Sequence, residues 1–106
     1  MGELISQQDL PTAFICNSDY TALRLIKFLH QHGVGVPSAV SVIGSGNHDM
    51  ASMSIPGLTS FDLSIEHASR LVVQTLLNHI RQPELPWITL YVDTKLVERE
   101  SVRNIL

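Results

Sequence analysis

The chain alternates between short apolar runs and longer stretches in which apolar residues recur every three or four positions. Residues 12–16 and 40–44 are nearly continuous apolar runs, as expected of strands buried on both faces of a parallel sheet. Between them, residues 20–32 carry their apolar side chains on one broad helical face, and Gly33 follows as a helix-ending residue. This order of strand, helix and strand predicts a βαβ unit within an α/β fold, with a mainly parallel sheet and flanking helices.

The second half of the chain combines one long helical pattern with several shorter signals. Ser64 is a candidate cap for a helix that reaches residue 81 and has its apolar residues at helical spacing. Residues 87–92 alternate roughly between the two sides of a strand. The shorter signals predict a short helix over residues 48–53, and short strands over residues 58–61 and 95–99.

The apolar faces of these elements are large for so short a chain. Both long helices have wide apolar stripes, and both main strands are apolar on two faces. A chain of 106 residues buries only a modest share of its surface, and a sheet covered on both faces needs about four or five strands. We therefore expect an incomplete core, from a larger domain or from a chain that associates. A compact three-layer domain is the simpler alternative.

Composition and charge narrow the classes of function. A net charge of −3 without a basic run argues against a nucleic-acid surface on this chain. No apolar stretch approaches the roughly 20 residues that span a bilayer, and the first residues lack the pattern of a signal peptide. The single cysteine, Cys16, lies in an apolar run and has no partner for an internal disulfide. We expect a cytoplasmic protein without membrane contact.

Polar residues follow both main strands, at the positions where ligands commonly bind in βαβ units. Residues 17–19 follow the first strand, and residues 45–49 follow the second. In the simpler interpretation, Ser18 or Asp19 caps the next helix and residues 45–49 form an ordinary polar connection. In the functional interpretation, the same side chains also bind a small polar ligand beside the helix N-terminus.

Catalytic, metal and cofactor motifs are weak. Ser45 does not lie in a Gly-x-Ser-x-Gly turn, and adjacent residues such as Ser45, His48 and Asp49 rarely orient as a triad. The motif Gly44-x-Gly46 lacks the third glycine of a dinucleotide fingerprint. The five histidines show no second pair at ligand spacing. We expect no enzymatic activity, no metal and no cofactor.

Several short motifs, in this order and spacing, resemble the LacI/GalR family of bacterial transcription regulators. They are PTAFICNSD (11–19), AL (22–23), GVGVP (33–37), VSVIG (40–44), PGLT (56–59) and LVERES (96–101). The resemblance implies the C-terminal part of an effector-binding domain with the two-lobed, type I periplasmic-binding-protein-like fold. It implies four segments: a lead-in at 1–10, a portion of the C-terminal lobe at 11–62, a portion of the N-terminal lobe at 63–93, and a return to the C-terminal lobe at 94–106.

The resemblance also implies a binding site for a small polar effector, such as a sugar or a nucleoside. The implied ligand-binding residues are Ile15, Ser18, Asp19, Asn47 and Asp49. At the tip of the second main strand, residues 45–49, the family usually has an aromatic and then an acidic residue. This chain has Ser45 and Gly46 at those two positions. The missing carboxylate removes a charge-assisted hydrogen bond that contributes roughly 1.5–3 kcal/mol, which argues against conventional sugar binding at this tip.

The resemblance implies two partners. One is a second copy of the chain, and the other is DNA, which the family binds through a DNA-binding headpiece that these residues do not contain. The implied dimer interface consists of Leu23, Lys27, Met50, Met53 and Ile55. Met50 and Met53 fit equally well as ordinary core residues, because methionine packs adaptably in either setting. Unpartnered apolar faces independently favour self-association into a homodimer or a larger assembly. The alternatives are a solute-binding protein of a transport system and a small α/β hydrolase-like enzyme that uses residues 45–49.

Overall fold

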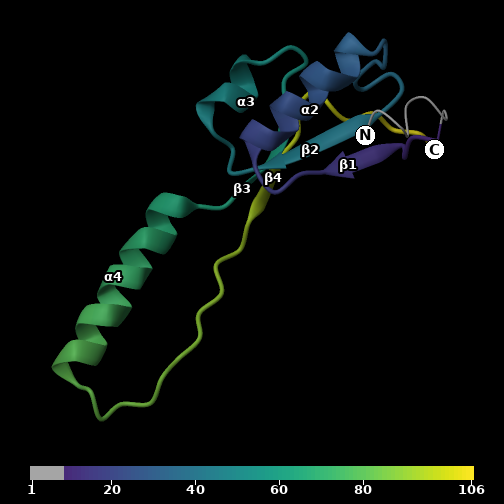
Figure 1. Ribbon diagram of the computed structural model, residues 1–106. Helices are drawn as coiled ribbons and strands as arrows, with labels where there is room; N and C mark the ends of the chain where they lie inside the picture. Colours follow the sequence, from purple (N-terminus) through teal and green to yellow (C-terminus); the bar gives the residue numbers. More distant parts are fainter. Residues whose placement is uncertain (1–8) are drawn as a thin grey trace.

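The computed structural model describes residues 9–106. They form a four-stranded sheet with helices packed on it and a long helical segment that projects away from it (Figure 1). The elements are, in chain order, β1 (Ala13–Ile15), α2 (Asp19–Gln31), β2 (Ser41–Ser45), α3 (Asp49–Met53), β3 (Thr59–Asp62), α4 (Ile65–Arg81) and β4 (Lys95–Val97). Strands β1, β2 and β3 are parallel, and β4 is antiparallel to β3. The predicted α/β fold with a mainly parallel sheet is confirmed.

Helix α2 forms where the apolar periodicity predicted it, within one residue at each end. Ser18 caps it, because its Oγ accepts the backbone N–H of Thr21 at 3.1 Å. Gly33 adopts a φ of +76° just past the helix and donates its N–H to a carbonyl of the last turn, which glycine does at little steric cost. The buried stripe of the helix consists of Ala22, Ile26 and Leu29.

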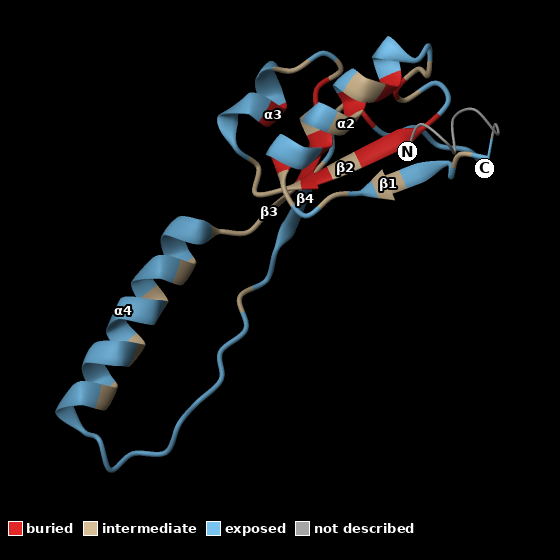
Figure 2. Cartoon of the chain, viewed as in Figure 1, coloured by how far each residue is buried: buried red, intermediate tan, exposed pale blue. Residues whose placement is uncertain are grey.

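The hydrophobic core lies between the sheet and the layer formed by α2 and α3. Figure 2 shows the buried residues gathered on β2 and on the side of α2 that faces it. The buried apolar residues are Ala22, Ile26, Leu29, Val36, Val40, Val42, Ala51 and Leu58. Helix α4, in contrast, contributes no buried residue although it is 17 residues long. This arrangement confirms the expected incomplete core. In the described part of the chain, no helix is both long and apolar enough to cross a membrane.

The prediction of a strand over residues 87–92 is wrong. These residues connect α4 to β4 without belonging to the sheet, and residues 87–91 are all exposed. A strand exists through hydrogen bonds to a neighbouring strand, and within residues 9–106 none runs beside this segment. Residues 87–92 have the alternating pattern of a strand, but the described part of the chain provides no neighbouring strand for them. The last predicted strand does form, although β4 spans three residues rather than five.

The predicted cap at Ser64 also needs correction. Ser64 precedes α4, but its backbone is left-handed at φ 50° and ψ 46°, and its side chain makes no capping hydrogen bond. A capping side chain normally requires an extended backbone at that position. Here the Ser64 N–H instead donates to Oδ1 of Asp62 at 2.9 Å, so the turn into α4 is held by the last residue of β3.

The segment after β4 is fastened to the sheet by Ser101, which is fully buried. Its Oγ donates to the Val42 carbonyl at 2.5 Å and accepts the Thr59 N–H at 2.9 Å. The Ser101 carbonyl in turn accepts the Val42 N–H at 3.0 Å. One short side chain therefore links the C-terminal segment to both β2 and β3.

We expect Ser101→Ala to lower the free energy of unfolding by about 1–2 kcal/mol, since it leaves the buried Thr59 N–H without an acceptor. Urea unfolding followed by circular dichroism measures this change. The matched control is Ser52→Ala, because the Ser52 hydroxyl bonds a carbonyl at the exposed surface of α3. We expect a change below about 0.5 kcal/mol there. Equal effects of the two variants would contradict the role of Ser101.

Candidate functional site

The candidate site lies where the parallel strands β1, β2 and β3 end. Because their carboxyl ends share one edge of the sheet, the tip after β1 and the loop after β2 are neighbours (Figure 1). The two are joined directly by a hydrogen bond from the His48 N–H to Oδ2 of Asp19, at 2.7 Å. The structure therefore brings together the two polar segments that the sequence singled out.

Asp19 links the elements at this edge of the sheet through a buried carboxylate. Its side chain is fully buried. Besides the bond from His48, its Oδ1 accepts the hydroxyl of Ser60 at 2.5 Å. Both carboxylate oxygens are thus engaged by the protein. The structure places Asp19 as the residue that positions α2 against the loop after β2 and against β3, and not on the accessible side of the tip.

Gly44 makes this close approach feasible. A side-chain carbon at this position would meet Asp19 Oδ1, the Asp19 Cα at 3.2 Å and the Leu58 Cδ2 at 2.8 Å. Separations below about 3 Å are too short for carbon atoms in contact. The glycine that ends the VSVIG motif is therefore required by the buried carboxylate beside it.

Ser18 and Ile15 form the accessible part of the first tip. Ser18 is half-buried, and its hydroxyl, while accepting the Thr21 N–H, also donates to the Thr21 hydroxyl at 3.1 Å. The capping interpretation of Ser18 is confirmed. Ile15 ends β1 with three quarters of its surface exposed. Cys16 follows it, and burial raises the pKa of its thiol, which keeps it in the protonated form.

Asn47 is tightly held at the second tip. Its backbone is left-handed at φ 50°, and its N–H donates to the Ser60 hydroxyl at 3.0 Å. In the side chain, Oδ1 accepts a bond from Arg99 Nη2 at 2.7 Å, and Nδ2 lies 3.4 Å from Oδ2 of Asp62. The orientation of the Asn47 amide is therefore set by β3 and by the segment after β4.

Ser60 and Arg99 are among the site-building residues that sequence reasoning missed. Ser60 is buried in β3 and bridges Asp19 to the Asn47 backbone. Arg99 donates to the Leu58 carbonyl at 2.7 Å in addition to its bond with Asn47. Ser60 carried no distinctive signal, because β3 (TSFD) contains several polar residues. Arg99 lies 52 residues from Asn47 in the sequence, so no local pattern linked the two residues. Arg99 appeared in the sequence analysis only as part of the LVERES motif.

His48 occupies the space beside Gly46. Gly46 has a φ of +115°, and a side chain there would come within 2.6 Å of the His48 Nε2. The imidazole is exposed, as is Asp49 at the start of α3. The accessible polar groups of this tip therefore come from residues 48 and 49, whereas residue 46 contributes backbone alone. No cluster of three or more histidine, cysteine, aspartate or glutamate side chains that could hold a metal ion occurs in residues 9–106.

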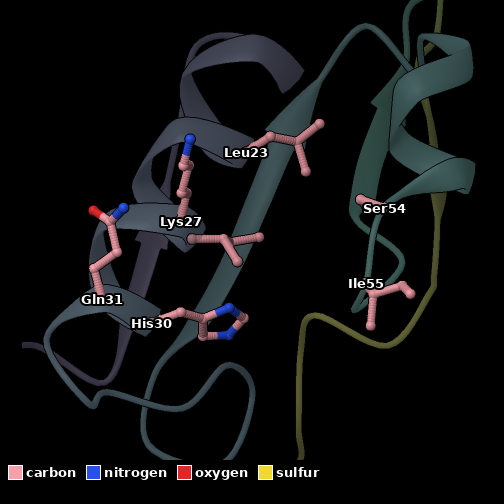
Figure 3. Close-up of a pocket in the computed structure, with 7 residues that line it drawn as sticks. Leu23, Lys27, His30, Gln31, Ser54 and Ile55 are labelled. Carbon is pink, nitrogen blue, oxygen red and sulfur yellow. The ribbon is translucent and has the colours of Figure 1, made fainter.

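A second surface lies beside α2, next to the segment that follows α3. A groove of about 550 Å³ separates α2 from the segment that follows α3. Figure 3 shows side chains of α2 on one side of this groove and Ser54 and Ile55 on the other. Three of the predicted interface residues, Leu23, Lys27 and Ile55, line it. The other two, Met50 and Met53, are exposed on the neighbouring helix α3.

A mainly parallel sheet with polar side chains at its carboxyl edge defines the chain as part of an α/β ligand-binding domain. The family model described as a periplasmic binding protein-like domain matches residues 2–102. The chain belongs to this family, and it corresponds to a portion of the effector domain of LacI-type transcriptional regulators. The family resemblance seen in the sequence is confirmed.

Individual relatives agree with this assignment. The transcriptional repressor PurR of Glaesserella parasuis serovar 5 (strain SH0165) is 35% identical over 112 residues, which cover 99% of this chain and 33% of that protein. A LacI-type transcription regulator from Bifidobacterium animalis subsp. lactis DSM 10140 has a TM-score of 0.85 at 31% identity, over 97% of this chain and 37% of that chain. A complex of the transcriptional regulator CelR with cellobiose has a TM-score of 0.85 at 27% identity, over 94% of this chain and 31% of that chain.

The chain spans about a third of the length of these relatives. They are transcriptional regulators rather than enzymes, in agreement with the expected non-enzymatic role.

Proposed function

We propose that this chain is the effector-sensing and dimerisation part of a LacI/GalR-like regulator, and that a small polar ligand binds at the tips of β1 and β2. The observation that carries the proposal is the direct bond between the two tips, from the His48 N–H to the buried Asp19 carboxylate. This bond holds polar groups from two loops at one edge of the sheet. A relative that is solved with cellobiose supports a small polar ligand.

The contacts proposed for the ligand follow from what is accessible. Ser18 offers a hydroxyl, Ile15 an apolar surface and Asp49 a carboxylate. The Oδ1 and Nδ2 atoms of Asn47 are both hydrogen-bonded within the protein. The amide of Asn47 therefore has a fixed orientation when a ligand binds. The imidazole of His48 stands beside Gly46, where the family usually carries an acidic side chain. We propose that His48 replaces that carboxylate as a hydrogen-bonding partner, which favours a nucleoside-like ligand with ring nitrogens over a plain sugar.

The proposed division into lobes is supported by the placement of the elements. All four strands belong to residues 11–62 and 94–106, and α4 with its return segment belongs to residues 63–93. Residues 1–8 of the proposed lead-in lie outside the described residues. We propose that DNA binding requires a headpiece that these residues do not contain, that this chain by itself leaves operator DNA unbound, and that the protein works in the cytoplasm.

We further propose that the groove beside α2 is a contact with a second copy. Leu23, Lys27 and Ile55 line the groove, and Met50 and Met53 extend the same surface onto α3. Exposed methionines next to aliphatic side chains suit an interface, since the thioether adapts to the surface that it meets.

The ligand site is tested by titrating the isotope-labelled chain with adenosine, ribose and cellobiose while recording amide resonances. We expect adenosine to shift the amides of residues 18 and 47–49 at millimolar concentration. Ser18→Ala removes one hydrogen bond and should weaken binding roughly 3- to 10-fold. The matched control is Ser38→Ala, because Ser38 is exposed at the opposite end of β2 and should leave affinity unchanged. Absence of shifts at these amides with all three probes would refute the site.

A further inference from the structure

Two residues other than glycine have left-handed backbones within residues 9–106, namely Asn47 and Ser64, each with a φ of 50°. Residues that carry a side chain adopt this conformation rarely, and they keep it where neighbouring groups hold it in place. Asn47 lies in the loop that follows β2, whereas Ser64 lies in the turn into α4. Both residues are bonded to the same side chain, the carboxylate of Asp62 at the end of β3.

The carboxylate of Asp62 uses a different oxygen for each of these residues. Oδ1 accepts the backbone N–H of Ser64 at 2.9 Å and so closes the turn into α4. Oδ2 lies 3.4 Å from Nδ2 of Asn47. At the other atom of the same amide, Nη2 of Arg99 donates to Oδ1 of Asn47 at 2.7 Å. Because a guanidinium only donates and a carboxylate only accepts, the Asn47 amide has a single orientation between them.

The loop after β2 is also bonded along β3 through its backbone. The Gly46 N–H donates to the Phe61 carbonyl at 2.8 Å, and the Asn47 N–H donates to the Ser60 hydroxyl at 3.0 Å. These bonds keep the loop backbone in place beside the end of the strand. The side-chain contact between Asn47 and Asp62 is longer than an ordinary hydrogen bond, so it can shorten or lengthen without disturbing the sheet.

We propose, building on the ligand site proposed above, that Asp62 is a positioning residue of that site. It acts through Asn47 and couples the site to the turn into α4. A ligand that bonds the Asn47 amide changes the separation between Nδ2 and Oδ2 of Asp62. The two oxygens belong to one planar group and rotate together, so the contact of Oδ1 with Ser64 changes as well. Because coupling between two sites is reciprocal, a change in the Ser64 turn also alters Asn47.

The simpler alternative is that the two bonds of Asp62 are independent local contacts. Asp62→Asn separates the two interpretations. Its amide oxygen can still accept the Ser64 N–H and keep the turn into α4. The amide nitrogen then faces Nδ2 of Asn47, and two donors do not bond each other. This variant therefore keeps the turn and breaks its connection with the loop after β2.

The first experiment uses the full isotope-labelled chain with adenosine as the probe. In the unmodified chain, we expect adenosine to shift the Ser64 amide together with the amides of residues 47–49. In Asp62→Asn, the affinity should fall roughly 3- to 10-fold and the shift at Ser64 should disappear. The backbone coupling constant that reports the φ of Ser64 should stay unchanged. Asp93→Asn is the matched control, because it makes the same charge change at an exposed residue and should keep both the affinity and the Ser64 shift.

The second experiment needs no ligand and reads the connection in the opposite direction. Ser64→Pro removes the N–H that Asp62 accepts and sets φ near about −65°, so the turn releases Oδ1. We expect the side-chain amide resonances of Asn47 to shift. Ser64→Ala is the matched control, since it keeps the N–H and removes a hydroxyl that makes no capping bond. Helix α4 contributes no buried residue, so the core should fold in both variants.

Three results overturn the role of Asp62. They are an adenosine-induced shift of Ser64 that persists in Asp62→Asn, an Asn47 side chain that does not respond to Ser64→Pro, and equal responses of Asn47 to Ser64→Pro and Ser64→Ala. Absence of adenosine shifts at residues 18 and 47–49 in the unmodified chain refutes the ligand site instead. The comparison of Ser64→Pro with Ser64→Ala still decides whether Asp62 connects the two turns, so the two proposals fail separately.

Discussion

Replacing Asp19 with alanine will lower the free energy of unfolding by about 3 kcal/mol, because it leaves two donors without an acceptor at a buried position. The Asp19 carboxylate accepts the His48 N–H at 2.7 Å and the Ser60 hydroxyl at 2.5 Å, and its side chain has no exposed surface. Water cannot replace the lost acceptor at full strength there. Urea unfolding should show the midpoint falling by roughly 2 M, given the denaturant dependence usual for a chain of this size.

Two further variants separate the lost hydrogen bonds from a general effect of mutation. Asp19→Asn keeps one acceptor oxygen and presents an amide donor at the other position. The Ser60 hydroxyl can rotate to accept from it, so the loss should be about half that of Asp19→Ala. Asp49→Ala removes an exposed carboxylate at the start of α3 and should cost less than about 1 kcal/mol. If Asp49→Ala is as damaging as Asp19→Ala, the buried carboxylate does not have the role described.

Gly44→Ala should destabilise the chain by a similar amount, about 3 kcal/mol, through crowding rather than through a missing bond. The added carbon would lie 2.8 Å from Leu58 Cδ2 and 3.2 Å from the Asp19 Cα, and would also press on Asp19 Oδ1. Of these atoms, the Asp19 Cα belongs to the backbone and cannot move without shifting α2. Urea unfolding measures the loss, and the amide resonances of residues 18, 19 and 48 should shift in the folded fraction.

The matched control is Gly33→Ala, at a glycine just past the end of α2. Gly33 has a φ of +76°, but nothing lies within 4 Å of an added carbon. The cost should therefore be confined to backbone strain, about 1 kcal/mol. A Gly33→Ala variant that is less stable than Gly44→Ala would show that left-handed backbone, and not close packing against Asp19, dominates the glycine requirement.

The elements with strong local patterns were predicted well. Helix α2 has an apolar stripe, a serine cap and a terminal glycine, and each of these signals acts over a few residues. Strand β2 was predicted from a continuous apolar run and forms one residue later. The prediction failed at residues 87–92, because a strand also needs a neighbour to bond with. It failed again at Ser64, where the Asp62 carboxylate, and not the serine side chain, bonds the backbone of the turn.

The candidate site was predictable in outline and not in detail. Parallel strands place their ends at one edge, so the meeting of the Ser18 tip with the loop after β2 follows from the order of elements. The bonds that build the site join residues far apart in the chain, such as Ser60 with Asp19 and Arg99 with Asn47. No local pattern encodes such pairs, because their partners become neighbours after the sheet has formed.

The order and spacing of short motifs identified the family by resemblance. Apolar periodicity, capping residues and the order of strands and helices sufficed to establish the α/β class, the βαβ unit and the incomplete core. These features depend on interactions within a few residues or on the alternation of buried faces. The roles of individual polar residues depended on folding. Asp19 has the same chemistry as Asp49, yet one is enclosed by two donors and the other is exposed. Burial and hydrogen-bond partners are properties of the packed chain, and they decide whether a carboxylate holds the structure together or remains free to meet a ligand.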